Sequence, residues 1–458
     1  MSVKAVVLGA GKGTRMKSDK AKVLHEVAGR PLILWMLQLL DDIHVDETVV
    51  VVGHQADSVA EILPDGTGTA LQADQLGTGH ATQIGLGELV TEPGDTVIVL
   101  PGDMPLIRTE SLAGLVAAHR NEEAAATILT IQDGPRDFGR IVREDGAVVG
   151  IVEARDCTPE QYEIGEVNTS VYVFEADALR SALTELTPEN DQGELYLTDV
   201  IGILVGRGAS VAAYSADAEE ATGVNSHDQL SMAASVLRGR INLRLMQSGV
   251  AMQDPDRTYI DAGSVVEPGA RLYADVHVEG DSHIAAGAEV GPGVFMRDST
   301  VGPNSRVWYS VLRQADVGED AEVGPYVSLR PGASLATGAK AGTFVEIKNS
   351  VVGEGSKVPH LAYLGDATIG KGSNIGAGTI TANHDGYKKH RTVIGDGVKI
   401  GSDNVLVAPV AVGDDAWTGA GSVITKDVES GALAVTRSPQ KEVPGYAARR
   451  RARAEQEQ

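Results

Sequence analysis

The sequence predicts two architectures in one chain: an α/β domain on a mostly parallel sheet, followed by a parallel β-helix of hexapeptide repeats. Three observations carry this prediction. Short β-branched runs alternate with helically spaced apolar residues up to about residue 224, one amphipathic segment follows, and beyond Arg257 an aliphatic residue recurs at every sixth position. We therefore divide the 458 residues into a first domain at 1–225, a linker helix at 226–248, and a second domain with a C-terminal tail at 249–458.

The first domain is predicted from its strands and helices. β-branched runs at 3–8, 48–52 and 96–100 each end in a glycine or a Pro-Gly turn, and helical apolar spacing covers 32–40 and 112–119. Buried strands separated by helices are typical of a parallel sheet that is covered on both faces.

The linker and the second domain are predicted from two different periods. Apolar residues recur at helical intervals between 226 and 248, which indicates one amphipathic helix. A low-complexity linker would not hold the following period of six over such a length, so we expect a stacked β-helix, interrupted by loops at 360–366 and 381–391. The inward residues are expected to be Ile260, Val266, Leu272, Val278, Ile284, Val290, Met296, Val317, Val323, Leu329, Leu335, Ala341, Ile347, Ile394, Ile400, Leu406, Val412, Thr418 and Ile424.

Composition narrows the possible partners. With 39 Lys+Arg and 63 Asp+Glu the formal net charge is −24, so we expect binding to neither nucleic acid nor a membrane surface. The single cysteine, Cys157, excludes an intrachain disulfide and a Cys-based metal cluster. No run approaches the roughly 18 apolar residues of a membrane helix, and we expect a cytoplasmic protein. The basic tail at 449–453 is expected to be disordered.

A glycine-rich turn follows the first strand. Leu8, Gly9, Ala10 and Gly11 lead into Lys12-Gly13-Thr14-Arg15, which fits neither a P-loop nor a dinucleotide fingerprint because Thr14 occupies the last glycine position of both. Such a turn can be purely structural. The cations Arg15 and Lys22 close behind it favour the binding of a triphosphate instead.

Further motifs carry a family resemblance. Gly11 to Met16, Lys22-Val23-Leu24 and the segment 72–81 together resemble the sugar-1-phosphate nucleotidyltransferases, and in particular the N-acetylglucosamine-1-phosphate uridylyltransferases. The resemblance implies a Rossmann-like α/β nucleotidyltransferase domain. It assigns uridine reading to Gln72, Gly77 and Thr78, Mg²⁺ to Asp103 and Asn225, and the acetamido sugar to Gly139, Glu153 and Asn168. Pro101 departs from the family pattern in the pocket wall.

The second domain resembles the bifunctional members of that family, which implies a left-handed β-helix with acetyltransferase activity. His360 is the expected general base toward an amine, since an imidazole titrates near neutral pH. Asn383 is expected to orient the thioester or stabilise the oxyanion, and His384 stands where the family usually has Tyr. The expected glucosamine-1-phosphate contacts are Arg330, Lys348, Tyr363, Asn374 and Lys389, and the expected acetyl-CoA contacts are Ala377, Ser402, Ala420 and Arg437.

The resemblance as a whole implies two reactions: acetyl transfer from acetyl-CoA to glucosamine-1-phosphate, then uridylyl transfer from UTP to N-acetylglucosamine-1-phosphate. It also implies a homotrimer that shares its acetyl-transfer sites. Two alternatives stay open. The β-helix can be a noncatalytic regulatory part of another nucleotidyltransferase, or the first domain can be a decayed binding module on an acyltransferase.

Overall fold

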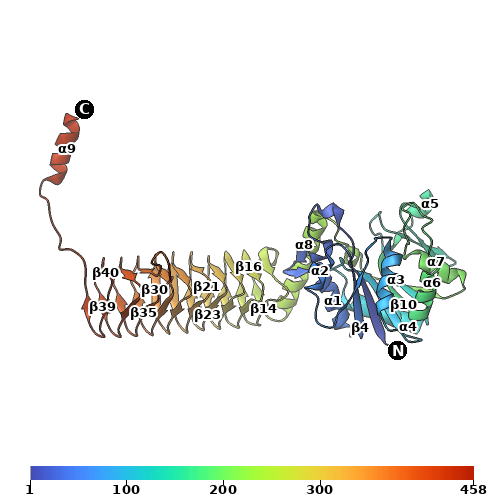
Figure 1. Cartoon of the computed structure of the whole chain (residues 1–458), viewed down its shortest axis with the longest axis horizontal. Helices are drawn as coiled ribbons and strands as arrows, with labels where there is room; N and C mark the ends of the chain where they lie inside the picture. Colours follow the sequence, from blue (N-terminus) through green and yellow to red (C-terminus); the bar gives the residue numbers. More distant parts are fainter. Residues whose placement is uncertain (1, 458) are drawn as a thin grey trace. The chain divides into compact units, whose positions relative to one another are not determined.

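The computed structural model describes residues 2–457 (Figure 1). Its contacts divide the chain into two compact units, Met1–Arg240 and Ile241–Gln458. The division falls inside helix α8 (His227–Gln247), the helix predicted as the linker. Within the described residues, no helix is both long and apolar enough to cross a membrane.

The first unit is built on one nine-stranded sheet with the order β11-β7-β10-β6-β1-β4-β5. The neighbours β6, β1 and β4 run parallel, as predicted, and β5, for which no strand was predicted, runs parallel to β4. The sheet as a whole is mixed, because β10 runs antiparallel to both β6 and β7 and carries the hairpin β8–β9 at its side. The strands are β1 (Val3–Leu8), β4 (Glu47–Val52), β5 (Gly68–Leu71), β6 (Thr96–Pro101), β7 (Ala126–Gln132), β8 (Arg140–Glu144), β9 (Ala147–Val152), β10 (Glu166–Glu175) and β11 (Val211–Ser215).

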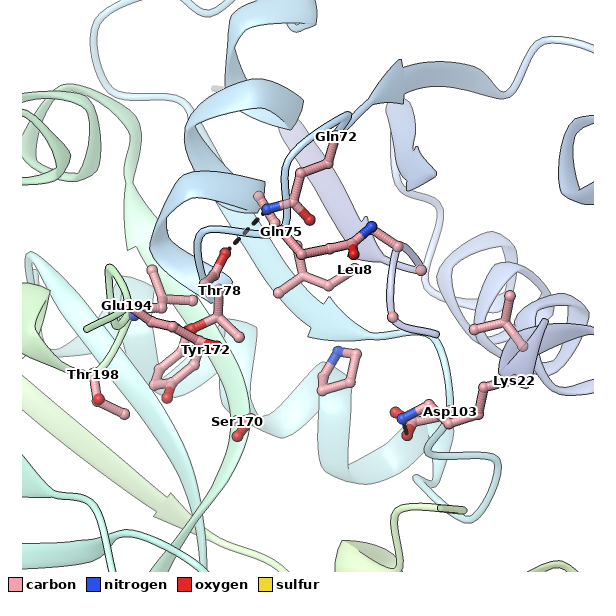
Figure 2. A pocket seen from close by; sticks show the side chains of 18 of the residues that line it. Leu8, Lys22, Gln72, Gln75, Thr78, Asp103, Ser170, Tyr172, Glu194 and Thr198 are labelled. Atoms are coloured by element: carbon pink, nitrogen blue, oxygen red, sulfur yellow. Dashed lines mark hydrogen bonds and ion pairs between the residues drawn. The ribbon is translucent and has the colours of Figure 1, made fainter. Parts of the chain in front are cut away.

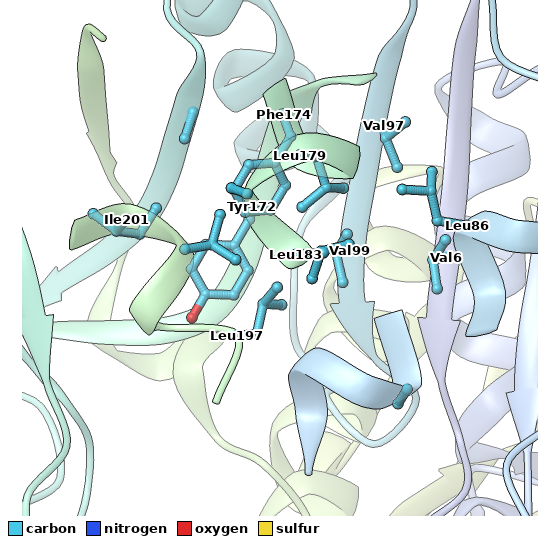
Figure 3. Close-up of a cluster of buried hydrophobic side chains, with 14 of the residues drawn as sticks. Val6, Leu86, Val97, Val99, Tyr172, Phe174, Leu179, Leu183, Leu197 and Ile201 are labelled. Carbon is cyan, nitrogen blue, oxygen red and sulfur yellow. The ribbon is translucent and has the colours of Figure 1, made fainter. Parts of the chain in front are cut away.

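Helices cover both faces of this sheet. Along β1, Val6 points into one apolar cluster while Ala5 and Val7 point into the other, as the alternation of a strand requires. Figure 3 shows the first cluster, in which Tyr172 and Phe174 of β10 pack beside Leu179 and Leu183. The helices packed on that face are α3 (Thr78–Glu88), α6 (Ala176–Leu183) and α7 (Asp199–Gly206), and those on the opposite face are α1 (Leu32–Asp42), α2 (Ala56–Ala60) and α4 (Thr109–Asn121).

The second unit stacks its strands into three parallel sheets of 11, 10 and 9 strands, an arrangement consistent with a left-handed β-helix (Figure 1). All 19 aliphatic or threonine positions predicted to point inward are buried, so the period of six is confirmed. The sheets begin with β12 (Ala251–Met252), β13 (Thr258–Ile260) and β14 (Val265–Val266) and end with β41 (Leu433–Ala434), β40 (Val423–Ile424) and β38 (Val410–Val412).

The prediction of two interrupting loops is half wrong. Val351 pairs with Thr368, 17 positions later, which is an ordinary coil, and the stretch 360–366 contains strand β31 (Tyr363–Gly365). What looked like an insertion is a corner shortened by one residue. Thr368 pairs with Val393, 25 positions later, so the interrupting loop lies in the second predicted place, around 383–391.

The C-terminal tail also differs from expectation. Residues Tyr446–Gln456 form helix α9 rather than a disordered end, and none of its residues is buried. The helix is strongly basic, with four arginines in its sequence.

Candidate active sites

A cavity of about 320 Å³ opens at the carboxyl ends of β1 and β6 in the first unit. Ligands of open α/β sheets bind at this edge. The cavity brings together predicted residues from distant segments, and Figure 2 shows Gln72 and Thr78 on one side, with Lys22 and Asp103 on the other. The predicted residues among its lining are Leu8, Gly9, Ala10, Gly11, Lys22, Gln72, Gly77, Thr78, Asp103 and Glu153, and Pro101 lines it as well.

The glycine-rich turn is shaped by close packing. Gly9 donates its N–H to the carbonyl of Val51 at 2.9 Å, which holds the turn against the neighbouring strand. Gly13 has φ +61°, and a Cβ there would lie 2.7 Å from the Cβ of Lys22, so glycine is required at this position. Arg15 is exposed on the 3-10 turn Thr14–Met16 and does not line the cavity.

The two predicted metal ligands, Asp103 and Asn225, both contact the ammonium group of Lys22. The ammonium group of Lys22 forms an ion pair with the carboxylate of Asp103 and donates to the amide oxygen of Asn225 at 3.1 Å. Both oxygens therefore converge on one position suited to positive charge. Within residues 2–457 no cluster of three His, Cys, Asp or Glu side chains could hold a metal. A site with two protein oxygens suits Mg²⁺, which commonly keeps water and phosphate oxygens as its other ligands.

The predicted uridine-reading glutamine is partly committed to its own loop. Gln72 is buried, and its amide nitrogen donates to the carbonyl of Gly77 at 3.2 Å and contacts Nδ1 of His80 at 3.2 Å. The donor half of the amide is thus engaged. The carbonyl half remains to accept a hydrogen bond, for example from the N3–H group of uracil.

The part of the cavity predicted to hold the acetamido sugar is lined by Glu153, Tyr172 and Thr198. The hydroxyl of Thr198 donates to Glu153 at 3.1 Å, and the amide of Asn168 donates to the Tyr172 hydroxyl at 2.7 Å. Burial raises the pKa of Glu153, with Asp156 and Asp199 adding to the rise while the bond from Thr198 opposes it. Gly139 packs beside this carboxylate, since a Cβ on it would lie 3.5 Å from Oε2 of Glu153.

One wall of the cavity was missed by the sequence reasoning. Glu194, Leu197 and Thr198 line it, and Ser170, also not predicted, lines the cavity as well. Backbone hydrogen bonds at 2.8 Å join this wall to the segment 72–81, which is predicted to read uridine: Gly79 donates to Leu195, and Leu195 donates to Leu76. The hydroxyl of Thr78 accepts from the N–H of Leu197 at 3.1 Å. The only available signal was the acidic and hydroxyl-bearing run around 194–199, which carries no recognisable period.

In the second unit, three predicted glucosamine-1-phosphate contacts form a cationic cluster. Leu329 of β25 (Ser328–Leu329) pairs with Ile347 of β28 (Glu346–Lys348), so Arg330 and Lys348 follow on adjacent rungs. A contact with the ammonium group of Lys389, and the charge of that group, lower the pKa of Lys348. Two ammonium groups in contact are arranged to receive an anion. The nearby guanidinium of Arg330 is paired with the carboxylate of Glu346 at 2.7 Å.

The predicted base and amide lie close to this cluster along the chain. His360 ends strand β30 (Lys357–His360) and is exposed, as a base toward an external substrate must be. Asn383 is buried, and its amide nitrogen donates to the buried carboxylate of Asp366 at 2.5 Å. Tyr363 is half-buried on β31, and Asn374 is half-buried at the start of β33 (Asn374–Ile375). Asp366 was not among the predicted site residues.

The four predicted acetyl-CoA contacts are linked in a column. Asp403 donates its N–H to the carbonyl of Ala377 at 2.7 Å, and Gly421 donates to Ser402 at 2.8 Å, which places Ala377, Ser402 and Ala420 on successive coils. The guanidinium of Arg437 donates to the carbonyl of Ala420 at 2.7 Å. His384 is exposed on the interrupting loop, where it bridges to Lys389.

Comparison with known proteins places the chain among relatives that match it over nearly its whole length. Residues 5–200 match the model of the MobA-like NTP transferase domain. A protein named bifunctional protein GlmU from Heliobacterium modesticaldum is 47% identical over 95% of this chain and 96% of its own. One of the same name from Thermobifida fusca is 48% identical over 97% of this chain and 94% of its own. A crystal structure from Bacillus anthracis, assigned as a glucose-1-phosphate thymidylyltransferase and bound to sucrose, aligns at 20% identity over 51% of this chain and 95% of that one, with a TM-score of 0.43.

Proposed function

The chain belongs to the family of proteins named bifunctional protein GlmU, and we infer from this membership that it is a bifunctional transferase of UDP-N-acetylglucosamine synthesis. One activity is acetyl transfer from acetyl-CoA to glucosamine-1-phosphate. The other is uridylyl transfer from UTP to the resulting N-acetylglucosamine-1-phosphate, with release of pyrophosphate. The observation that carries this function is the match over nearly the whole length of relatives named as bifunctional. UTP and acetyl-CoA are cytoplasmic metabolites, which supports a cytoplasmic enzyme.

Uridylyl transfer is proposed for the cavity of the first unit. A phosphate oxygen of the sugar phosphate attacks the α-phosphorus of UTP, a new O–P bond forms, and the bond to pyrophosphate breaks. The attacking phosphate is already ionised, so the site needs no general base. The residues of the chain position the reactants and neutralise charge, the contribution that dominates phosphoryl transfer.

The predicted residues at the cavity and beside it each have a task in this proposal. The backbone of the glycine-rich turn and the side chain of Lys22 hold the triphosphate, and Arg15, on the exposed turn beside the cavity, adds positive charge. Glu153 and Asn168 hold the acetamido sugar, and the carbonyl of Gln72 accepts from the base. The enzyme needs a divalent metal, which we propose to be Mg²⁺ held by Asp103 and Asn225. When bound there, the ion supplies positive charge to the phosphate oxygens of the nucleotide.

Acetyl transfer is proposed for the second unit. Arg330, Lys348 and Lys389 hold the phosphate of glucosamine-1-phosphate. The amine nitrogen attacks the thioester carbonyl, a C–N bond forms and the C–S bond breaks. The imidazole of His360 takes the proton that leaves the nitrogen, and coenzyme A departs as a thiolate that is then protonated. Ala377, Ser402, Ala420 and Arg437 contact the coenzyme in this proposal, which the main-chain bonds that link them on successive coils support.

Product analysis by mass spectrometry tests both activities at once. With glucosamine-1-phosphate, acetyl-CoA, UTP and Mg²⁺ we expect coenzyme A, pyrophosphate and UDP-N-acetylglucosamine. Omitting UTP should stop the sequence at N-acetylglucosamine-1-phosphate. His360→Ala should abolish coenzyme A release while uridylyl transfer continues at the wild-type rate. Coenzyme A release by this variant at the wild-type rate would contradict the assignment of the base.

We further propose that the protein assembles as a homotrimer through its β-helix. Tyr309, Tyr326 and Phe344 stack on consecutive coils with ring centroids 5.9 and 5.4 Å apart, and Leu361 follows them on the next coil. All four side chains are exposed. A continuous apolar stripe of this kind is typical of an interface.

Introducing a charge into the stripe tests the assembly. In Tyr326→Glu, three carboxylates would be buried at the interface, so we expect monomers in sedimentation velocity where the wild type sediments as a trimer. Val351→Glu is the matched control and should remain trimeric, because Val351 is exposed on a strand of the sheet that contains neither strand flanking Tyr326. A trimeric Tyr326→Glu would contradict the role of the stripe.

A further inference from the structure

We propose that Asp366 is a positioning residue of the acetyl-transfer site: it fixes the side-chain amide of Asn383 so that the carbonyl oxygen, and not the amide nitrogen, faces the amine of the sugar phosphate. This inference rests on the acetyltransferase function proposed above. It replaces the expectation that Asn383 acts on the thioester or its oxyanion, because those oxygen atoms would need a donor.

The orientation of Asn383 follows from the chemistry of its partner. The two oxygens of the Asp366 carboxylate accept from two amide nitrogens, Oδ1 from Asn349 and Oδ2 from Asn383, both at 2.5 Å. An ionised carboxylate can only accept hydrogen bonds. Both amides must therefore turn their nitrogen atoms toward Asp366, and the carbonyl oxygen of Asn383 must point the other way.

Hydrogen bonds and nearby ammonium groups keep the carboxylate of Asp366 ionised. Asp366 is 8% exposed, and burial alone would raise its pKa, but the bonds from Asn349 and Asn383 and the charges of Lys389 and Lys348 lower the pKa below its usual value. These are the titratable groups that face it from the neighbouring coil and from the interrupting loop. Asp366 thus remains an acceptor through the neutral range, and its role here involves no proton transfer.

The surroundings hold both side chains in place. The main chain of Asn383 accepts from the N–H of His390 at 2.7 Å, and the main chain of Asp366 accepts from Thr392 at 3.1 Å. Gly365 makes room for the amide, since a Cβ there would lie 2.6 Å from Nδ2 of Asn383. Packing and main-chain bonds therefore leave Asn383 little freedom to rotate.

The free end of the amide is available to a ligand. Across residues 2–457 the carbonyl oxygen of Asn383 accepts no hydrogen bond, and it is not among the side-chain atoms that are sealed from solvent without a partner. A carbonyl oxygen repels phosphate and accepts from N–H groups. Beside the Lys348–Lys389 cluster it therefore complements the other end of glucosamine-1-phosphate, where the amine must present its lone pair to the thioester while one N–H is held.

Exchanging the two side chains tests the proposal. In Asp366→Asn the new amide lets Asn383 turn, so a donor faces the amine, and kcat/KM for glucosamine-1-phosphate should fall by about 10- to 100-fold, as for a lost hydrogen bond to a charged group. Asn383→Asp places two carboxylates against each other and should also be impaired. In the double variant Asp366→Asn/Asn383→Asp, the amide at 366 donates to the carboxylate at 383, whose second oxygen again faces the amine, and activity should recover above both single variants.

The controls separate this role from a structural one. The KM for acetyl-CoA and the rate of uridylyl transfer should stay within about 2-fold of wild type in all variants. Asn349→Ala removes the other amide from Asp366 and should lower kcat/KM by less than about 3-fold. An unchanged kcat/KM in Asp366→Asn, or a double variant no better than the single variants, overturns the positioning role. If Asp366→Asn does not fold, the double variant is compared with Asn383→Asp. A wild type that releases no coenzyme A contradicts the proposed acetyltransferase function instead.

Discussion

Lys22 has a central position in the candidate site of the first unit. Its ammonium group contacts both Asp103 and Asn225, whose oxygens are the proposed ligands of a divalent ion. The lysine therefore neutralises a nearly buried carboxylate while no metal is bound. When a metal takes this position, the ammonium group must leave it, and the nearest anions for it are the phosphates of the nucleotide.

Lys22→Met should lower kcat/KM for uridylyl transfer by about 10²- to 10³-fold, the usual cost of losing one group that stabilises charge in a transition state. The substitution should also lower the melting temperature more in EDTA than in millimolar Mg²⁺. Without Lys22, only a bound metal ion can neutralise the negative charge of Asp103. Differential scanning fluorimetry in both buffers measures this, with acetyl transfer as the control for folding. A melting temperature equally lowered in both buffers would speak against a shared cation position.

Glu153 should show opposite effects on stability and function. Its pKa is raised mainly by burial, so its contribution to stability is fully present below the unfolded value of about 4.3 and is lost as the pH rises through the raised folded value. At pH 7.5 the ionised carboxylate therefore costs stability. Glu153→Gln should raise the melting temperature at pH 7.5 but not at pH 4, and it should lower kcat/KM for N-acetylglucosamine-1-phosphate at least about 10-fold. A lower melting temperature of Glu153→Gln at pH 7.5 would contradict the prediction that the ionised carboxylate destabilises the fold.

At the scale of elements, the start of α3 is hydrogen-bonded to the cavity wall at 194–198, and the two segments are packed together. Gly79 lies in the first turn of α3 against Leu195, and a Cβ on it would lie 2.9 Å from the carbonyl oxygen of that residue. The segment 72–81 and the wall at 194–198 are hydrogen-bonded here, so a displacement of one displaces the other.

Gly79→Ala should force these segments apart, destabilise the first unit by about 1–3 kcal/mol and raise KM for UTP and for the sugar phosphate together. Gly87→Ala is the matched control, because Gly87 lies in the same helix with nothing within 4 Å of an added Cβ. It should stabilise the unit by up to about 1 kcal/mol, since alanine is the better helix former. Denaturant unfolding and steady-state kinetics measure both variants. A Gly79→Ala enzyme with unchanged KM values would show that the two segments move independently.

The elements that could be predicted are those whose periods are local. The buried hexapeptide residues, α8 and the parallel strands β1, β4 and β6 follow from the spacing of side chains within one segment. The antiparallel strand β10 and the hairpin β8–β9 could not be predicted, because their pairing joins residues far apart in sequence. Likewise, motifs located Lys22 and Asn383, whereas Thr198 and Asp366 act through other residues and have no motif of their own.

At the scale of the whole molecule, each unit contains the residues proposed for one reaction. The intermediate, N-acetylglucosamine-1-phosphate, would therefore leave one site and enter the other through solution. A mixture of Asp103→Asn, which lacks a metal ligand, and His360→Ala, which lacks the base, should form UDP-N-acetylglucosamine although neither variant does so alone. Chromatography of the nucleotides measures this. The absence of product from the mixture, with each remaining activity intact, would indicate direct transfer within one assembly.

The stacking of coils in the second unit limits how far the structural effect of a substitution can extend. Each coil is paired only with the coil before it and the coil after it, so a residue in one rung has no partner several rungs away. Stability is then close to a sum of neighbouring terms. Whole coils can therefore be gained or lost in evolution at places remote from Arg330 and Ser402. The distances between the functional side chains of the retained coils then stay the same.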